Sequence, residues 1–251
     1  MLTTERKTLL LDVLARDGRI VAKALSQQLG LSEDTIRRDL RELAAEGLLQ
    51  RVHGGALPAS PALANLAGRR MISRDGKASV ARAAVKMLRA GQIVAIDGGT
   101  TAIALARSLP TDRELTVVTH SPDIAAVLVD NPGVSVEMIG GRIYRHSNVA
   151  VGALAHEAIR RIRTDFFFMG VTGIHAEFGL TTGDREDAAI KRAFCEQAAE
   201  AIVLASHEKI GAVSAYEILP LGEVAGVIVE KNQAEAELSP LIARGVNIIR
   251  A

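Results

Sequence analysis

Residues 97–101 read Asp-Gly-Gly-Thr-Thr and directly follow a short apolar run that ends at Ile96. Glycines let backbone N–H groups approach an anion closely, hydroxyl groups can donate hydrogen bonds to it, and the N-terminus of a following helix adds a partial positive charge. The segment therefore predicts a phosphate-binding loop made of Asp97, Gly98, Gly99, Thr100 and Thr101. For a glycine pair taken alone, an ordinary tight turn is the alternative.

Small or polar residues follow three further apolar runs in the same way. In a parallel sheet, ligands bind beyond the carboxyl ends of the strands, so we expect these residues to converge on one effector-binding site. They are Thr119, His120 and Ser121 after the second run, Gly140, Gly141 and Arg142 after the third, and Gly170 and Gly173 after the fourth.

Three residues at or near this expected site have two explanations each, and Cys195 has one. Lys191 and Lys209 could complete an anion site, and a solvated surface lysine is an equally simple explanation. His120 could contact a ligand or respond to pH, although a lone histidine is more often a packed polar residue. Cys195 has no histidine partner nearby in sequence, so we expect it to serve in packing.

A row of arginines indicates a second kind of chemistry, which is contact with DNA. A helix is expected to start after Ser32, a good N-cap, and its apolar face lies almost opposite Arg38. The expected DNA-binding residues are Ser32, Asp34, Thr35, Arg37, Arg38, Arg41, Arg51 and His53. The alternative is an amphipathic helix whose arginines are merely solvated.

The elements around this helix predict a winged helix-turn-helix domain over residues 1–57. Apolar residues repeat at helical spacing from Thr4 to Ala15 and again from Ala22 to Leu29. Leu48 to Val52 indicates a strand that turns at Gly54-Gly55, and Arg19 to Val21 could pair with this wing. Two helices, a recognition helix and a hairpin make up a domain of this kind.

Residues 58–75 are expected to be a linker, because the stretch ALPASPALANLAG is rich in Ala, Pro and Ser. Residues 76–251 then alternate apolar runs with helical segments, which predicts an α/β domain with a mainly parallel sheet covered on both faces. The expected strands are Ile93–Ile96, Leu115–Val118, Val134–Ile139, Phe166–Met169, Ile202–Ala205, Val224–Val229 and Val246–Ile249. The expected helices are Lys77–Leu88, Thr101–Leu109, Ile124–Val129, Val151–Ile162, Arg185–Glu200 and Glu235–Ala243.

Several strings of this sequence carry a family resemblance. IRRDL, EGLL and RVHGGA in the first domain, and DGGTT, TVVTHS and IGGRIY in the second, closely resemble DeoR-type (GlpR-like) bacterial transcriptional regulators. The resemblance implies a repressor with a winged helix and a sensor domain similar to sugar-phosphate isomerases. It also implies a phosphorylated sugar or a related metabolite as effector.

The resemblance extends to single positions in the expected effector site. The family has a lysine at the places of Lys191 and Lys209, which favours their role as ligands. It usually has Asn where His120 stands and Asp where Ser206 stands. Both differences lie near the expected pocket and leave open an effector unlike the family's best-known sugar phosphates.

Composition limits the remaining function classes. The chain of 251 residues has a formal net charge of +1, so attraction to DNA must come from a local patch. A single cysteine excludes an internal disulfide, and no spacing of ligand residues predicts a metal site or a cofactor. Without an apolar run long enough for a membrane span or a signal peptide, we expect a cytoplasmic protein. Its expected partners are double-stranded operator DNA, a phosphorylated effector and further copies of itself in a homo-oligomer.

A sugar-phosphate isomerase with an appended helical domain is the alternative function. Isomerases of the resembling fold show an Asp-Gly-x-Asp-Glu cluster after the fourth strand, whereas this chain has Gly-Val-Thr-Gly-Ile at 170–174. Asp97, Asp184 and Glu186 remain as possible bases, but they lack that arrangement. Binding without turnover is therefore the favoured prediction.

Overall fold

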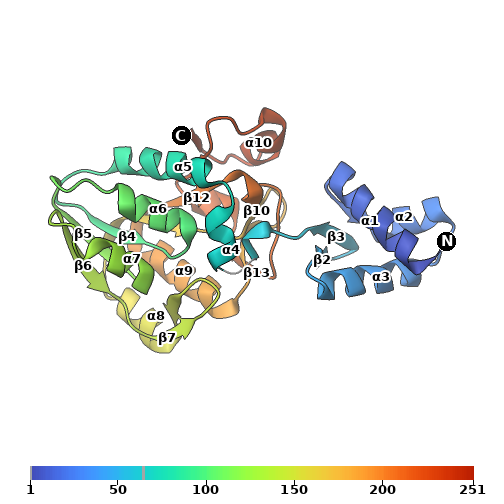
Figure 1. Cartoon of the computed structure of the whole chain (residues 1–251), viewed down its shortest axis with the longest axis horizontal. Helices are drawn as coiled ribbons and strands as arrows, with labels where there is room; N and C mark the ends of the chain where they lie inside the picture. Colours follow the sequence, from blue (N-terminus) through green and yellow to red (C-terminus); the bar gives the residue numbers. More distant parts are fainter. Residues whose placement is uncertain (1, 64–65) are drawn as a thin grey trace.

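The computed structural model describes residues 2–63 and 66–251 and shows a small N-terminal domain beside a larger α/β domain (Figure 1). Residues 64 and 65 of the expected linker, and residue 1, lie outside the described residues. Within the described part, no helix is both long enough and apolar enough to cross a membrane.

The N-terminal domain is the predicted winged helix. Three helices pack on a small sheet with strand order β1-β3-β2, and β1 pairs with β3 antiparallel, as the sequence suggested. The apolar stripes of the helices form one core that includes Leu10, Leu14, Leu25, Ile36 and Leu40. The elements are α1 (Thr3–Asp17), β1 (Ile20–Val21), α2 (Ala22–Leu29), α3 (Glu33–Ala45), β2 (Leu49–Val52) and β3 (Gly55–Pro58).

Helix α3 forms where its capping residues predict it. The Ser32 side chain accepts a hydrogen bond from the Thr35 N–H at 3.2 Å, and Gly47 after the last turn has a φ of 75°. Ile36, Leu40 and Leu43 are buried, so the opposite face of the helix remains in solvent.

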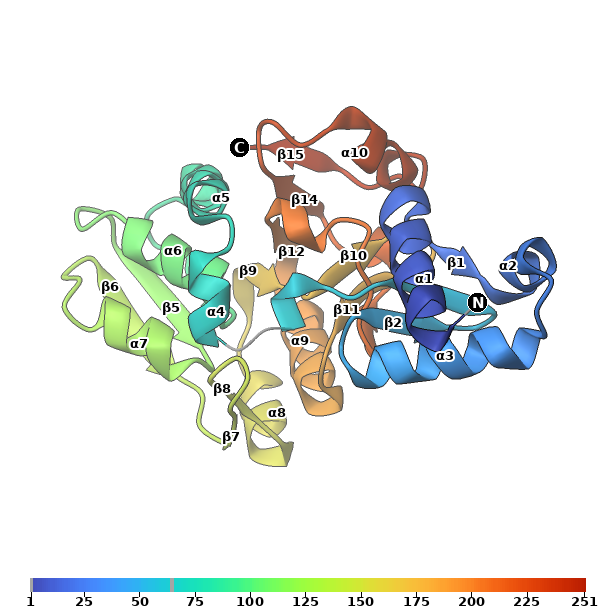
Figure 2. The same ribbon diagram turned by 45° about the vertical axis from the view of Figure 1, so that its right-hand side comes forward.

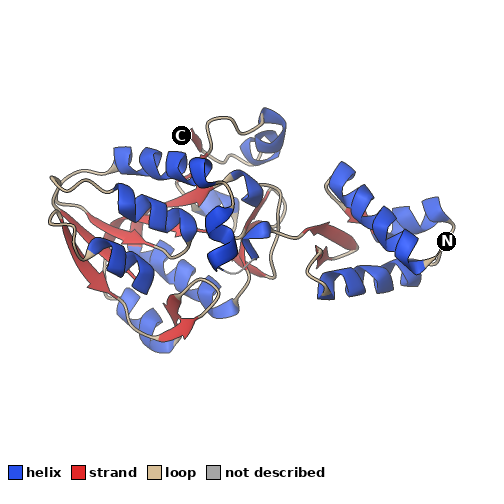
Figure 3. Cartoon of the chain, viewed as in Figure 1, coloured by secondary structure: helices blue, strands red, loops and turns tan. Residues whose placement is uncertain are grey.

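A seven-stranded parallel sheet is the centre of the second domain, with strand order β15-β14-β12-β9-β4-β5-β6. Figure 3 shows the strands in the middle of this domain with helices around them. All seven predicted strands are present, because strands buried on both faces have continuous apolar sequences. Their bounds are β4 (Ile93–Ile96), β5 (Leu115–Thr119), β6 (Val134–Met138), β9 (Thr164–Gly170), β12 (Ala198–Ala205), β14 (Gly226–Val229) and β15 (Ile248–Arg250).

Helices cover both faces of this sheet. Successive residues of β9 alternate between two cores: Phe166 and Phe168 pack with α5, α6 and α7, whereas Phe167 and Met169 pack with α8, α9 and α10. The helices are α5 (Arg74–Met87), α6 (Thr100–Ser108), α7 (Pro122–Leu128), α8 (Ala153–Ile159), α9 (Arg185–Gln197) and α10 (Glu235–Ile242).

Two predicted helices are too long. Val149–Val151 is strand β8, so α8 begins only after Gly152, and β8 pairs with β7 (Arg142–Tyr144). Helix α9 ends at Gln197, because Ala198 already pairs with Thr164 of β9. A small antiparallel sheet of β10 (Gly173–His175), β11 (Gly179–Thr182) and β13 (Tyr216–Leu219) was not predicted.

The described part of residues 58–75 contains helical turns, which the linker prediction did not include. Ala59 forms an isolated bridge with Val213, and a 3-10 turn η1 spans Pro61–Leu63. Helix α4 (Leu66–Met71) then packs against α6 (Figure 2), and α5 begins three residues earlier than expected. The domain boundary itself stays a prediction.

Candidate functional site

The exposed face of α3 carries the predicted arginine row. Arg37, Arg38 and Arg41 are all exposed. Arg37 pairs with Glu33 one turn earlier, with 2.7 Å between Nη2 and Oε1, whereas no ion pair is recorded for Arg38 or Arg41 within residues 2–63 and 66–251. Arg38 and Arg41 are thus available to an external anion.

The wing lies beside this helix and brings further predicted residues to it. Arg37, Arg51 and His53 line one hollow of about 160 Å³ between α3 and the wing. The wing needs glycine at Gly55, since a Cβ there would lie 1.7 Å from the Ile20 carbonyl oxygen. Ser32 and Thr35 hydrogen-bond each other through their hydroxyls at 2.9 Å, and Asp34 is exposed in the same first turn.

One residue pair that supports α3 was not predicted. Asp39 is fully buried and forms an ion pair with Arg6 of α1, in which Arg6 Nη2 donates to Asp39 Oδ1 at 3.0 Å. The sequence did contain a signal for this pair. Asp39 lies on the apolar stripe three residues after Ile36, and a charged residue on a buried stripe needs a partner.

The α/β domain has a small cavity of about 30 Å³ at the carboxyl ends of β4, β9 and β12. Its lining includes the predicted residues Gly98, Gly99, Thr100, Thr101, Gly170, Lys191 and Lys209. Gly99 has a φ of 97°, a conformation that favours glycine, and it starts α6 directly at this cavity.

Asp97 lies beneath the cavity and organises its base. Its Oδ1 accepts from the Gly98 N–H at 2.7 Å and from His120 Nε2 at 2.8 Å, and its Oδ2 accepts from the Gly170 N–H at 2.7 Å and from Lys191. Burial alone would raise the pKa of Asp97, but the charge of Lys191 and the hydrogen bond from His120 outweigh burial and lower it. Asp97 is therefore an ionised anchor for the loops around the cavity.

His120 has the packed role that was one of its two explanations. It is fully buried, and its Nδ1 lies 2.8 Å from the Ala150 carbonyl oxygen while Nε2 contacts Asp97. Both ring nitrogens thus face oxygen acceptors, which fixes the orientation of the ring between Asp97 and the Ala150 carbonyl. Thr119 is also structural, since its hydroxyl donates to the Ile96 carbonyl at 2.7 Å, and Ser121 is buried beside it.

Four other predicted effector residues do not line the cavity. Gly140, Gly141 and Arg142 follow β6, which is the edge strand of the sheet, and the Arg142 side chain is exposed and pairs with Glu186. Gly173 is buried in β10, where its backbone packs against Ala212. The prediction that every strand end meets at one mouth neglected the distance from the edge strand to the centre of the sheet.

Four cavity residues with charged side chains were missed by the sequence prediction. They are Arg69 of α4, Lys77 of α5, Asp187 of α9 and Glu208 of the 3-10 turn η2 (His207–Lys209). Asp187 had a local signal, because it lies one helical turn before Lys191 and pairs with it at 3.5 Å. Arg69 had none, since it falls in the segment expected to be a linker.

Three buried cations at the cavity lack full charge compensation. Burial lowers the pKa of Lys209 to about 8, and it also lowers the pKa values of Arg69 and Lys77. Lys209 Nζ donates to the Leu204 carbonyl at 3.1 Å and to the Thr101 hydroxyl at 3.3 Å, and neither of these partners is charged. Lys191 differs, because the carboxylates of Asp187 and Asp97 outweigh its burial and raise its pKa.

Unpartnered polar atoms also gather at this cavity. Arg69 Nε, Asp187 Oδ1 and Glu208 Oε2 are buried and have no hydrogen-bond partner among the residues that the structure describes. Such atoms in a folded protein usually bind a water, an ion or a ligand. One donor and two acceptors are thus open to a bound molecule.

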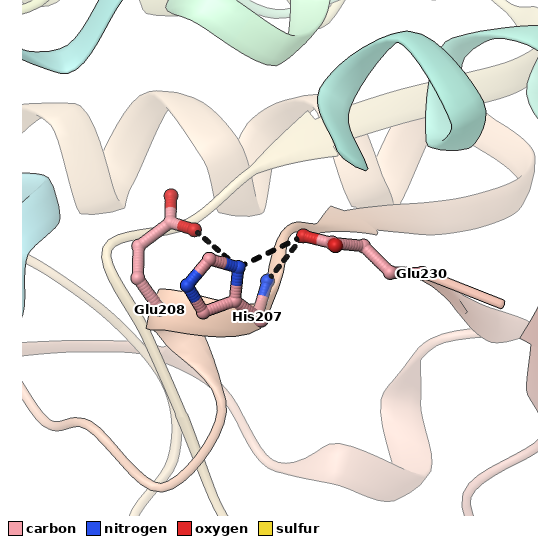
Figure 4. A group of neighbouring side chains, drawn as sticks. All are labelled: His207, Glu208 and Glu230. Carbon is pink, nitrogen blue, oxygen red and sulfur yellow. Dashed lines mark hydrogen bonds and ion pairs between the residues drawn. The ribbon is translucent and has the colours of Figure 1, made fainter. Parts of the chain in front are cut away.

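His207, Glu208 and Glu230 lie together beside the cavity (Figure 4). Glu230 accepts hydrogen bonds from the Ser73 hydroxyl at 2.6 Å and from the His207 N–H at 2.9 Å, so it ties the start of α5 to η2. Their ligand atoms are close enough to hold a metal ion, a grouping that sequence spacing missed because Glu230 lies on a later strand end. The existing hydrogen bonds account for the position of Glu230 without a metal.

Two family profiles match the chain. The profile described as "DeoR-like helix-turn-helix domain" matches residues 6–61, and the profile described as "DeoR C terminal sensor domain" matches residues 72–231. The chain belongs to the DeoR family. This membership confirms the predicted winged helix and the predicted α/β sensor domain.

Similar DeoR-family proteins match over nearly their whole length. The chain is 37% identical to the HTH-type transcriptional regulator GlpR of Haloferax volcanii, over 89% of this chain and 88% of that protein. It is 30% identical to the HTH-type transcriptional repressor GlcR of Bacillus subtilis, over 99% and 96% of the two chains. It is 29% identical to the glycerol-3-phosphate regulon repressor of Escherichia coli, over 84% of each. These matches confirm a transcriptional regulator rather than an enzyme.

The possible bases of the isomerase alternative have structural roles in this DeoR-family protein. Asp184 caps α9 by accepting from the Glu186 N–H at 2.9 Å and the Asp187 N–H at 3.0 Å. Glu186 pairs with Arg142 on the surface, and Asp97 is held by four donors. None of these three carboxylates lines the described cavity.

Proposed function

We propose that this DeoR-family regulator represses genes of carbohydrate metabolism and responds to a phosphorylated sugar or a related metabolite in the sensor cavity. The observation that carries the proposal is the set of buried cations at the N-terminus of α6. Arg69, Lys77, Lys191 and Lys209 line a cavity whose own carboxylates are Asp187 and Glu208. With Asp97 beneath them, four cations stand against three carboxylates, and the helix N-terminus adds further positive potential.

A phosphomonoester suits this arrangement better than a neutral sugar does. Its oxygens accept hydrogen bonds from lysine, threonine hydroxyls and backbone N–H groups, and its negative charge offsets the burial of Lys209. The name of the Escherichia coli relative contains such a compound, glycerol 3-phosphate. Ligand hydroxyls could donate to the unpartnered oxygens of Asp187 and Glu208.

On the DNA side, the proposal assigns base contacts to Arg38 and Arg41 of α3 and phosphate contacts to Arg37 and the wing. Arg38 and Arg41 have no competing ion pair in the described chain, so they can reach base edges without breaking an internal contact. Arg51 and His53 lie on the adjacent wing. Two copies of the chain would read paired half-sites, which is why we propose a homo-oligomer as the binding form.

A thermal-shift screen of phosphorylated sugars, their unphosphorylated parents and inorganic phosphate tests the effector. We expect a phosphorylated compound to raise the melting temperature, and Thr100→Ala with Thr101→Ala to abolish that rise. Ser108→Ala is the matched control, because Ser108 lies on the same helix and donates only to the Ala104 carbonyl. An equal rise in the double variant, or a rise with neutral sugars alone, contradicts the assigned site.

A further inference from the structure

Arg69 differs from the other cations of the sensor cavity in its position along the chain. It lies on α4, in the segment that leads from the wing strand β3 to the sensor domain, whereas Lys191 and Lys209 belong to elements that flank the sheet. The same segment touches the sensor domain at Ala59, which bridges to Val213, and at Ala62, which also lines the cavity. Residues between the two domains therefore form part of the effector site.

The guanidinium of Arg69 is placed to meet an anion at the start of α6. Arg69 is 8% exposed, and its Nη1 lies 3.8 Å from the place where a Cβ of Gly99 would stand. Nη2 donates to the His146 carbonyl at 2.7 Å and to the Ser147 hydroxyl at 3.4 Å, and Nε is buried without a hydrogen-bond partner in the described part of the chain. Arginine binds phosphate through two parallel N–H groups, so the open Nε and a neighbouring Nη form a suitable pair.

The cavity must widen before it can hold a phosphorylated metabolite. Its volume of about 30 Å³ is well below the roughly 300 to 1,000 Å³ of small-molecule sites. Lys191 and Asp187 are fixed by Asp97 and by the Thr182 hydroxyl, which donates to Asp187 Oδ2 at 2.7 Å. Arg69 reaches across from a separate element to a loop carbonyl, so its side chain can move without breaking the base of the cavity.

We propose that Arg69 binds the phosphate group of the effector and that this contact transmits occupancy of the cavity to the DNA-binding domain. This inference rests on the proposed function and adds the route by which effector binding reaches the DNA-binding domain. A phosphate at the N-terminus of α6 draws the guanidinium from the His146 carbonyl, and α4 moves with it. Because α4 and η1 both lie in the stretch of chain that joins the wing to the sensor domain, a movement of α4 changes the position of the winged helix.

Arg69→Gln and Arg70→Gln form a matched pair for the test. Arg70 is the next residue on the same helix and is exposed. It does not line the sensor cavity but the neighbouring hollow beside α6, which shares Lys77 and Thr100 with that cavity. Each variant and the wild type are titrated onto a labelled duplex selected from a random pool by the wild-type chain. The titrations are made with no ligand and with saturating glycerol 3-phosphate, ribose 5-phosphate or fructose 6-phosphate, using the compound that most stabilises the wild type.

The measured quantity is the ratio of DNA affinity with and without the compound, within each variant, so that differences in basal affinity cancel. We expect Arg70→Gln to keep the wild-type ratio and Arg69→Gln to give a ratio within about twofold of one. Calorimetry should show the compound still binding to Arg69→Gln, about tenfold to hundredfold more weakly, as expected for loss of a charge-assisted hydrogen bond.

If Arg69→Gln at saturating compound gives the same ratio of DNA affinities as the wild type, the inference is overturned, while the proposed function stands. If none of the compounds binds the wild type or Arg70→Gln, the proposed effector class fails, and the inference fails with it. Should Arg69→Gln not fold, Arg69→Lys replaces it. Lysine keeps the charge but cannot form two parallel contacts, so we expect binding with a reduced ratio, and an unchanged ratio would again contradict the proposal.

Discussion

Replacement of Asp97 by asparagine should destabilise the sensor domain strongly, because four donors converge on this one carboxylate. Gly98 N–H and His120 Nε2 meet Oδ1, and Gly170 N–H and Lys191 meet Oδ2. An asparagine side chain has one acceptor oxygen and one amide that donates. Whichever way the amide is turned, two donors face its NH₂ group. Lys191 loses the charge of Asp97 in either case and keeps the Asp187 carboxylate at 3.5 Å.

The expected decrease in the free energy of unfolding follows from the lost hydrogen bonds and the lost charge of Asp97. Removing one partner of a buried ion pair costs about 3–5 kcal/mol, because the remaining charge stays buried. That amount is a large part of the roughly 5–15 kcal/mol by which a domain is typically stable. Asp165→Asn is the matched control: Asp165 is exposed and accepts a single hydrogen bond, from the Ile93 N–H at 2.8 Å. Loss of this single hydrogen bond should lower the free energy of unfolding by about 0.5–1.5 kcal/mol.

Urea unfolding followed by far-ultraviolet circular dichroism measures both variants, since the chain has no tryptophan. The pKa of Asp97 is lowered in the folded state, so its contribution is complete above the ordinary aspartate pKa of about 4. The contribution is lost as pH falls through the folded pKa, and the gap between the wild type and Asp97→Asn should shrink in acid. A cost for Asp97→Asn no larger than that for Asp165→Asn at pH 7 would refute the four-donor account.

Three further predictions concern the two sites. Arg38→Ala should weaken binding to the selected duplex by about 1–3 kcal/mol, whereas Arg37→Ala should mainly reduce the salt dependence of binding; anisotropy titrations at several salt concentrations would reveal equal effects if this assignment is wrong. Arg6→Met should cost the winged helix about 3–5 kcal/mol by leaving Asp39 buried and unpaired, which denaturation would detect and which an unchanged unfolding curve would contradict. Because the pKa of Lys209 is about 8, affinity for a phosphorylated compound should fall by up to about tenfold per pH unit above pH 8, and calorimetry should find no such fall in Lys209→Gln.

The sequence predicted those parts of the molecule that depend on local patterns. The apolar runs from Ile93 to Ile249 identified every strand of the parallel sheet, and the cap at Ser32 placed the start of α3. Glycines and threonines at 98–101 were placed at the sensor cavity, because a loop between a strand and a helix is fixed by its immediate neighbours. Each of these signals comes from residues that lie within about a dozen positions of one another in the sequence.

Residues that reach the site across the fold could not be predicted in this way. Arg69 enters the cavity only because α4 packs on α6, and Glu230 meets His207 only because β14 lies beside β12. Arg142 shows the opposite error, because it was predicted to bind the effector. It follows a strand end and has suitable chemistry, but it lies at the edge of the sheet, away from the cavity. The packing of α4 on α6 and the order of strands in the sheet decided these outcomes, and a single sequence contains neither.

Fluorescence anisotropy of the selected duplex, titrated with the chain in the presence and absence of the stabilising phosphorylated compound, tests the central claim most directly. The account predicts specific, salt-dependent binding whose affinity changes at least about tenfold with the compound. It also predicts that the variant with alanine at both Thr100 and Thr101 binds the duplex but does not respond. The account is contradicted if the affinity of the wild type for the duplex stays the same at saturating compound. It is also contradicted if the double variant responds to the compound as fully as the wild type.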